Sequence, residues 1–316
     1  MKDNALGNSD GISLGAPPGG VMEWRAVVRT LRSPLRGVSA GWTQCFDDLV
    51  TTVFPDDCRV CGGSLLRAGA APVCDVCVSR LLPQSKTLAT ALCERCGEAV
   101  GMEHARVADQ FAGQIPAEGL LCAGCWEQVP EFARAVAYGV YEDGLREMIH
   151  LLKYERMAAL AEPLGELLAE AALELEDEAA RDLLVIGVPL FRGNRRERGY
   201  NQAVLLAEAA SKRLRVLRPA WRLRAGHDAL RRVKSTRSQF TLTAKGRTRN
   251  MRGAFAVADE AAVMGREVLL VDDIYTTGAT VRECARVLLR SGASRVWVAT
   301  LARAQKEAVA LWGEFG

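Results

Sequence analysis

The sequence has no apolar run long enough to cross a membrane and no segment composed like a secretory signal. No window approaches the about 18 consecutive apolar residues that a membrane-spanning helix needs. The first 20 residues lack a basic segment followed by an apolar run. These absences predict a cytoplasmic protein without membrane insertion. Its composition, 49% apolar and 25% charged residues, is that of an ordinary globular chain.

Two nucleotide-binding signatures are also missing. The chain has no Gly-x-x-x-x-Gly-Lys-Ser/Thr segment and no strand-linked Gly-x-Gly-x-x-Gly, which argues against nucleotide triphosphatases and dinucleotide enzymes. The net charge of +3 is unevenly spread: residues 181–252 carry 19 Lys or Arg against four acids, whereas residues 142–178 carry 11 acids against three bases. The basic region is suited to an anion, and the acidic stretch reads as a solvated helix face.

The chain divides into three parts by composition and periodicity. Residues 1–41 begin with a stretch rich in Gly, Ser, Asn and Pro, which predicts a disordered tail. Residues 42–130 begin with a helix at 42–54 and continue as a cysteine-rich module. Residues 131–316 alternate strands with helices, which predicts an α/β domain with a mainly parallel sheet. The expected strands are 135–141, 183–188, 220–224, 268–271 and 295–301, and the expected helices are 144–153, 157–176, 200–214 and 279–289.

Eight of the ten cysteines form four Cys-x-x-Cys pairs. The pairs are Cys58/Cys61, Cys74/Cys77, Cys93/Cys96 and Cys122/Cys125. A reducing cytosol argues against disulfides, and two thiolates at i and i+3 on a tight turn can face one metal ion. Pairing in sequential order closes the shorter gaps, of 12 and 25 residues. We therefore expect two structural zinc sites of four thiolates each, with redox or unliganded cysteines as the alternative.

Two further cysteines and one histidine are predicted to play no part in metal binding. Cys45 and Cys284 are expected to be buried thiols. His104 lies in the gap between the last two pairs, where four cysteines already suffice, and is expected at the surface.

A phosphate-binding turn is predicted by residues 268–280. An apolar strand leads into Asp272 and Asp273, and a turn rich in hydroxyls then opens a helix. Ligands of open α/β sheets bind beyond the carboxyl ends of the strands, and backbone N–H groups at a helix N-terminus suit a phosphate. The two carboxylates would repel that phosphate unless they accept hydrogen bonds, and sugar hydroxyls could donate them. The residues of the turn are Thr276, Thr277, Gly278, Ala279 and Thr280. The alternative is a generic strand–turn–helix with an acidic cap.

This segment resembles the phosphoribosyl-pyrophosphate motif of type I phosphoribosyltransferases. The resemblance implies that Asp272 and Asp273 bind the ribose hydroxyls and that the turn holds the 5′-phosphate.

Basic residues follow the strand 183–188. Four arginines leave its carboxyl end on what the sequence predicts to be a flexible loop, and a pyrophosphate needs such bidentate donors. They are Arg192, Arg195, Arg196 and Arg198. A second basic segment, 231–240, is expected to form a mobile loop that closes over the ligand. The alternative for both is a solvated basic face.

Several short motifs together resemble the ComF family. They are Lys153-Tyr154, Val188-Pro189-Leu190, the run from Arg198 to Gln202, Thr236-x-x-Gln239, Arg247-x-x-Asn250 and the Asp272-Asp273 pair. The resemblance covers about residues 42–303. It implies a double zinc ribbon joined to a type I phosphoribosyltransferase-like sheet with helices on both faces. It also implies a role in natural transformation, the handling of imported single-stranded DNA.

Three functions remain open at this point. A phosphoribosyltransferase would use Asp272, Asp273 and Arg198 on phosphoribosyl pyrophosphate with Mg²⁺, and a nucleophile would attack the anomeric carbon as pyrophosphate leaves. No general base or acceptor pocket is readable. A single-stranded-DNA-binding protein would use the basic region, with Phe191, Tyr200, Trp221 and Phe240 as stacking candidates and a core position as the alternative for Trp221. A scaffold would bind a DNA-uptake helicase or recombination protein through its zinc ribbons and the 42–54 helix.

Overall fold

The computed structural model describes residues 56–65, 71–88, 91–100, 120–234 and 244–305. All of them belong to the second of two units, Val50–Gly316, the first being Met1–Leu49. The expected tail, the expected 42–54 helix and the residues Cys45, His104, Thr236, Gln239 and Phe240 lie outside the described residues. The division at residue 130 stays a prediction.

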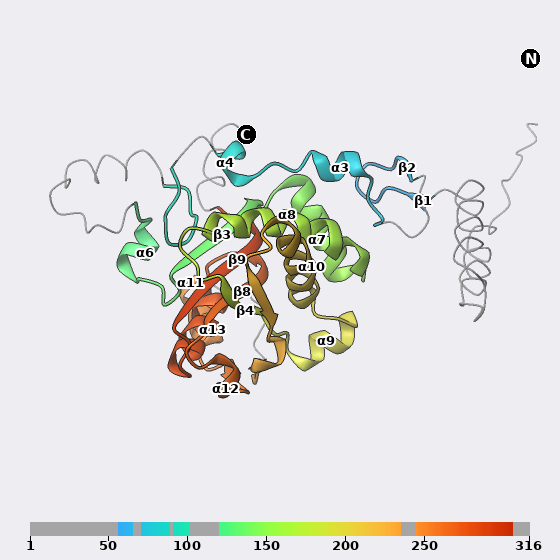
Figure 1. The fold of residues 1–316 in the computed structure, drawn as a ribbon. Helices are drawn as coiled ribbons and strands as arrows, with labels where there is room; N and C mark the ends of the chain where they lie inside the picture. The colour runs from blue at the N-terminus through green and yellow to red at the C-terminus, as the bar shows by residue number, and fades with distance from the viewer. Residues whose placement is uncertain (1–55, 66–70, 89–90, 101–119, 235–243, 306–316) are drawn as a thin grey trace, which may run out of the picture. The chain divides into compact units, whose positions relative to one another are not determined.

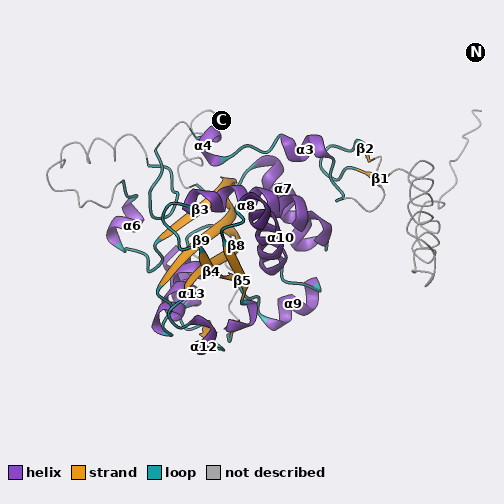
Figure 2. Ribbon diagram, in the orientation of Figure 1, coloured by secondary structure: helices purple, strands orange, loops and turns teal. Residues whose placement is uncertain are grey.

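The central element of the described chain is a parallel sheet in the order β3-β9-β8-β4-β5 (Figure 2). Its strands are β3 (Arg134–Val140), β4 (Asp182–Gly187), β5 (Arg222–Ala225), β8 (Glu267–Tyr275) and β9 (Arg295–Arg303). The expected α/β fold is confirmed. Strand β8 runs farther than the apolar pattern predicted, since it pairs with β9 as far as Tyr275 but with β4 only to Val271. Asp272 and Asp273 therefore lie past the end of β4.

Helices cover both faces of this sheet. Helices α8 (Ala161–Ala172) and α10 (Gln202–Leu217) lie on one face and α13 (Ala279–Arg290) on the other (Figure 1). Successive residues of β8 alternate between the two apolar cores: Leu269 and Val271 pack with α8 and α10, whereas Val268 and Leu270 pack with α13. A strand buried on both faces reads as an unbroken apolar run, which is why the sequence located it.

The remaining elements frame the sheet. Helix α7 (Asp143–Tyr154) follows β3, and the expected helix 157–176 is α8 flanked by short 3-10 turns. Strands β6 (Leu230–Arg232) and β7 (Phe255–Val257) pair antiparallel, with α11 (Ala244–Met251) between them along the chain and α12 (Glu260–Val263) after them. The closing loop expected at 231–240 is thus partly strand β6, and residues 235–243 lie outside the described chain.

One expected loop is a helix. Residues Arg192–Arg198 form α9, which follows the carboxyl end of β4 and ends at Gly199, whose φ is +86°. The prediction of a flexible loop was wrong at this point. Cys284 is fully buried in α13, as expected. Trp221 is buried too, which favours the core position over base stacking for this residue.

The cysteine module consists of short elements: β1 (Asp56–Asp57), β2 (Ser64–Leu65), α3 (Asp75–Ser79), α4 (Gln84–Thr87) and α6 (Ala123–Glu127). Within the described ranges, no helix has the length and apolar content needed to span a membrane.

Candidate functional site

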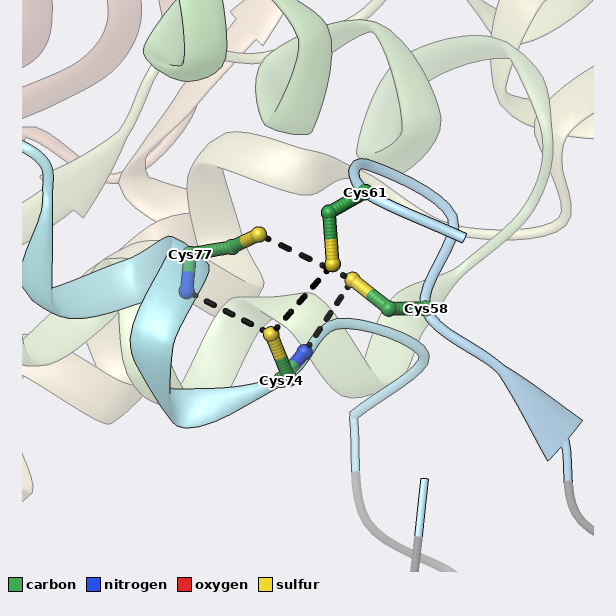
Figure 3. Close-up of side chains that lie close together, drawn as sticks. All are labelled: Cys58, Cys61, Cys74 and Cys77. Atoms are coloured by element: carbon green, nitrogen blue, oxygen red, sulfur yellow. Dashed lines mark hydrogen bonds between the residues drawn. The ribbon is translucent and has the colours of Figure 1, made fainter. Parts of the chain in front are cut away.

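The first cysteine cluster consists of Cys58, Cys61, Cys74 and Cys77. Their sulfurs point toward one another from the β1–β2 turn and from the start of α3 (Figure 3). The Sγ–Sγ distances are 3.8 Å for Cys58–Cys77 and for Cys61–Cys74. A tetrahedral zinc with Zn–S bonds of about 2.3 Å requires sulfurs roughly 3.8 Å apart. The four thiols therefore fit a structural zinc ion.

The second cysteine cluster consists of Cys93, Cys96, Cys122 and Cys125, whose four sulfurs lie within 4.8 Å of one another. The Sγ atoms of Cys96 and Cys122 are 3.6 Å apart. Sequential pairing of the Cys-x-x-Cys motifs is confirmed. All four of these cysteines are buried, whereas Cys61 of the first cluster is exposed.

The two clusters are built alike, as two copies of one small unit. Gly62 and Gly97 both take positive φ and donate their N–H to the carbonyl of the first cysteine, Cys58 or Cys93, at 2.8 Å. Positive φ is accessible to glycine at little cost, and this lets the chain turn tightly around the sulfurs. In each cluster the chain thus turns at a glycine directly after the first Cys-x-x-Cys pair.

The paired acids of β8 are not equivalent. Asp273 is buried, and its carboxylate accepts hydrogen bonds from Lys153 Nζ of α7 and from Gln202 Nε2 of α10, each at 2.8 Å. Burial alone would lower the pKa of Lys153, but the charge of Asp273 raises it above its usual value. Asp273 therefore joins β8 to α7 by an ion pair and to α10 by a hydrogen bond. The sequence contained Lys153 and Gln202 only as motif residues and gave no sign that they meet at Asp273.

Asp272 is more available to a ligand. Its side chain is only partly buried, and its Oδ1 accepts the Asp273 N–H at 2.9 Å. Burial and the neighbouring Asp273 charge raise the pKa of Asp272 to about 7. Asp272 thus changes charge near neutral pH, a shift typical of functional sites.

The predicted phosphate turn lies immediately after these acids. Gly278 has φ +73° and caps the N-terminus of α13. A Cβ at Gly278 would lie 2.2 Å from Tyr275 Oη, so no larger residue fits there without a shift. Thr276, Thr277 and Thr280 are partly exposed beside it, and Ala279 begins the helix. The turn thus brings hydroxyl groups and a glycine to the N-terminus of α13, and its binding of a phosphate stays a prediction.

The Arg198–Gln202 motif is mostly structural. Gly199 ends α9, Tyr200 Oη donates to the Leu152 carbonyl at 2.5 Å, and Asn201 caps α10 while its Nδ2 donates to the Val188 carbonyl at 3.0 Å. Gln202 reaches Asp273, as described above. The motif therefore links the chain after β4 to α7 and β8.

The arginines of α9 lie on a short helix after β4, and three of the four are exposed. Arg192, Arg195 and Arg196 are exposed, and the Arg198 guanidinium lies 5.0 Å from the centre of the Tyr154 ring. Among the described residues, no ion pair joins any of the four to Asp272 or Asp273. These arginines thus follow the carboxyl end of β4 on helix α9, and their part in binding a pyrophosphate stays a prediction.

Comparisons with known proteins agree with this architecture. Residues 201–311 match the phosphoribosyl transferase domain family. The DNA utilization protein YhgH of Escherichia coli K12 is 33% identical over 240 residues, which cover 75% of this chain and 93% of that protein. Competence protein F of Haemophilus influenzae is 32% identical over 186 residues, covering 58% of this chain and 78% of that protein. The chain belongs to the ComF family.

The ComF-family assignment agrees with the two four-cysteine clusters and the parallel sheet described above. Among solved structures, TT1426 from Thermus thermophilus covers 51% of this chain and 80% of its own length, at 21% identity and a TM-score of 0.26.

Proposed function

We propose that this ComF-family protein binds phosphoribosyl pyrophosphate at the carboxyl edge of its sheet and acts in DNA uptake. The observation that carries this proposal is the inequivalence of the two acids. Asp273 is held by Lys153 and Gln202, whereas within the described residues the Asp272 carboxylate accepts one hydrogen bond, from its neighbour's N–H. Asp272 therefore keeps oxygen lone pairs for a ligand beside the Gly278 turn.

Each part of this ligand has a counterpart. Ribose hydroxyls would donate to Asp272, and the 5′-phosphate would accept N–H groups of the turn and the hydroxyls of Thr276, Thr277 and Thr280. The pyrophosphate would meet Arg192, Arg195 or Arg196, since guanidinium groups bind phosphates bidentately. Mg²⁺ would accompany the pyrophosphate on ligand oxygens and water. If transfer occurs, the protein contributes positioning and charge stabilisation.

Asp272→Asn is expected to weaken phosphoribosyl-pyrophosphate binding by about 10- to 100-fold, since hydrogen bonds to a charged acceptor contribute about 1.5–3 kcal/mol. The measurement is calorimetric titration of the zinc-loaded protein with Mg²⁺ present. Asp177→Asn changes an exposed carboxylate far along the chain and should leave the affinity unchanged. Equal affinity in wild type and Asp272→Asn, or no binding by the folded wild type, would disprove the proposed site.

Binding should also depend on pH through Asp272. The ionised carboxylate accepts hydroxyl hydrogen bonds more strongly than the protonated acid, and the pKa of Asp272 is raised to about 7 by burial and by Asp273. Affinity should therefore rise roughly tenfold between pH 6 and pH 8, as the ionised fraction grows. Titrations of wild type and Asp272→Asn at both pH values test this, because the variant retains the contribution of the ligand's own phosphates. The same slope in both proteins would contradict the role given to Asp272.

Single-stranded DNA binding is a second candidate, favoured by the surface around α9. Three exposed arginines lie on that helix, and Tyr154, which is 50% exposed, lies under Arg198. Such a surface combines phosphate contacts with a ring for base stacking. Displacement of single-stranded DNA by phosphoribosyl pyrophosphate would place both ligands in one site. DNA binding that persists in Asp272→Asn and is lost in Arg195→Gln/Arg196→Gln would place the DNA on α9.

A protein partner, such as a DNA-uptake helicase or recombination protein, remains a third proposal. Trp126 and Val129, next to the second cysteine cluster, are large exposed apolar residues that such a partner could cover. Retention of a purified candidate helicase by the wild type and not by Trp126→Ser would support it.

A further inference from the structure

The second cysteine cluster receives hydrogen bonds from strand β9 and from helix α13, which begins at the proposed ligand turn. Arg303 lies at the carboxyl end of β9, and its side chain is 3% exposed. Its Nη2 donates to Cys96 Sγ at 3.3 Å and also to the Glu98 carboxylate. A buried guanidinium is stable only with such anionic acceptors. Arg303 thus connects the Cys93/Cys96 pair of this cluster to strand β9.

Arg282 connects the Cys122/Cys125 pair of the same cluster to helix α13. It lies in the first turn of α13, and its backbone N–H donates to the Gly278 carbonyl at 2.8 Å. Its side chain donates to the Gln128 carbonyl at 2.8 Å and to Cys125 Sγ at 3.7 Å. One residue therefore contacts both the ligand turn and the cysteine cluster.

Tyr275 connects Arg303 to the same turn. The Arg303 guanidinium lies 4.2 Å from the centre of the Tyr275 ring, and the ring is buried. The Tyr275 hydroxyl occupies the space beside Gly278 where a side chain would otherwise project. The turn therefore packs against the Tyr275 ring, and the Arg303 guanidinium packs against the same ring.

The first cluster has no comparable link in the described part of the chain. Among the described residues, the nitrogen donors to its sulfurs are backbone N–H groups of the cluster itself, those of Cys74 and Cys77. Four thiolates around Zn²⁺ carry a net charge of −2, and hydrogen bonds from outer residues orient and tune such ligands. In the second cluster those donors are two arginines that also support the ligand turn.

We propose that the metal state of the second cluster controls the order of the Thr276–Thr280 turn, with Arg282 and Arg303 as positioning residues. The inference deepens the proposed function and rests on it where ligand affinity is concerned. Loss of the metal frees the four thiols to move apart. Both guanidinium groups then lose their sulfur acceptors, and Tyr275 and the turn lose their support.

Hydrogen exchange followed by mass spectrometry tests the proposal without any ligand. Arg282→Gln should speed amide exchange in residues 275–282 about tenfold and weaken phosphoribosyl-pyrophosphate binding by a similar factor. Arg290→Gln, at the exposed far end of the same helix, is the matched control and should change neither. The paired variant Arg303→Met/Glu98→Gln, which removes both charges of the buried pair, should act in the same direction. If that variant does not fold, Arg282→Gln decides alone.

Graded chelation of the wild type supplies the metal-dependent readout. Exchange in residues 275–282 should rise together with exchange in residues 93–100 and not with exchange in residues 58–65. Opening of the second cluster with no change in the turn, or an Arg282→Gln turn as protected as wild type, overturns the inference. These outcomes are separate from failure of the proposed function, which is shown by wild type that does not bind the ligand.

Discussion

Replacing Lys153 with Met is expected to lower the free energy of unfolding by about 3–5 kcal/mol, because it leaves a buried carboxylate without its counter-charge. Lys153 Nζ lies 2.8 Å from Asp273 Oδ1, and the two side chains are only 15% and 5% exposed. The remaining side-chain partner of Asp273 among the described residues is the neutral amide of Gln202. Urea unfolding of the zinc-loaded protein, followed by circular dichroism, measures the effect.

The double variant Lys153→Met/Asp273→Asn separates the cost of leaving a buried charge unpaired from the cost of lost side-chain packing. It should recover most of the stability lost in Lys153→Met, since the unpaired charge is gone. Arg222→Met, which removes an exposed partner of Asp182, should cost less than about 1 kcal/mol. A Lys153→Met protein as stable as the Arg222→Met protein would show that the Asp273 tie contributes little.

The sequence predicted the features whose determinants are local. Each Cys-x-x-Cys pair is a local motif, so the sequence identified all eight cysteines, and the shorter gaps favoured the sequential pairing that the structure shows. The central strands β4 and β8 were visible as apolar runs because helices cover both faces of the sheet. Asp273 shows the limit of this approach. Its partner Gln202 is 71 residues away, and only the strand order brings the two together.

Helix α9 shows a second limit. Residues 192–198 carry four arginines, one glycine and no apolar stripe, so periodicity gave no helix signal. The structure shows two features of this helix that hydrophobic periodicity does not reveal. Gly199 ends the helix in a left-handed conformation, and Arg156 Nη2 donates to the Glu197 carbonyl at 2.6 Å from the segment after α7. Such a helix depends on its ends and on tertiary contacts more than on its own composition.

The two cysteine clusters should differ sharply in what they contribute to stability. Structural zinc in small domains binds with an apparent free energy of about 10–16 kcal/mol, comparable with the whole stability of a domain, about 5–15 kcal/mol. In the second cluster all four cysteines are buried, and Arg303 and Arg282 connect them to β9 and α13. In the first cluster Cys61 is exposed, and the sulfurs accept hydrogen bonds from backbone N–H groups of the cluster itself.

Cys96→Ser should therefore lower the melting temperature of the whole α/β domain by more than about 10 °C, whereas Cys61→Ser should leave the main transition within about 3 °C of wild type. Native mass spectrometry should find about one zinc fewer in either variant, so that the two proteins differ in stability and not in metal count. Scanning calorimetry gives the transitions. Equal losses of melting temperature in the two variants would mean that the arginine contacts add nothing to the second cluster. A larger loss in Cys61→Ser would reverse the assignment, because the first cluster would then be the one that the parallel sheet needs.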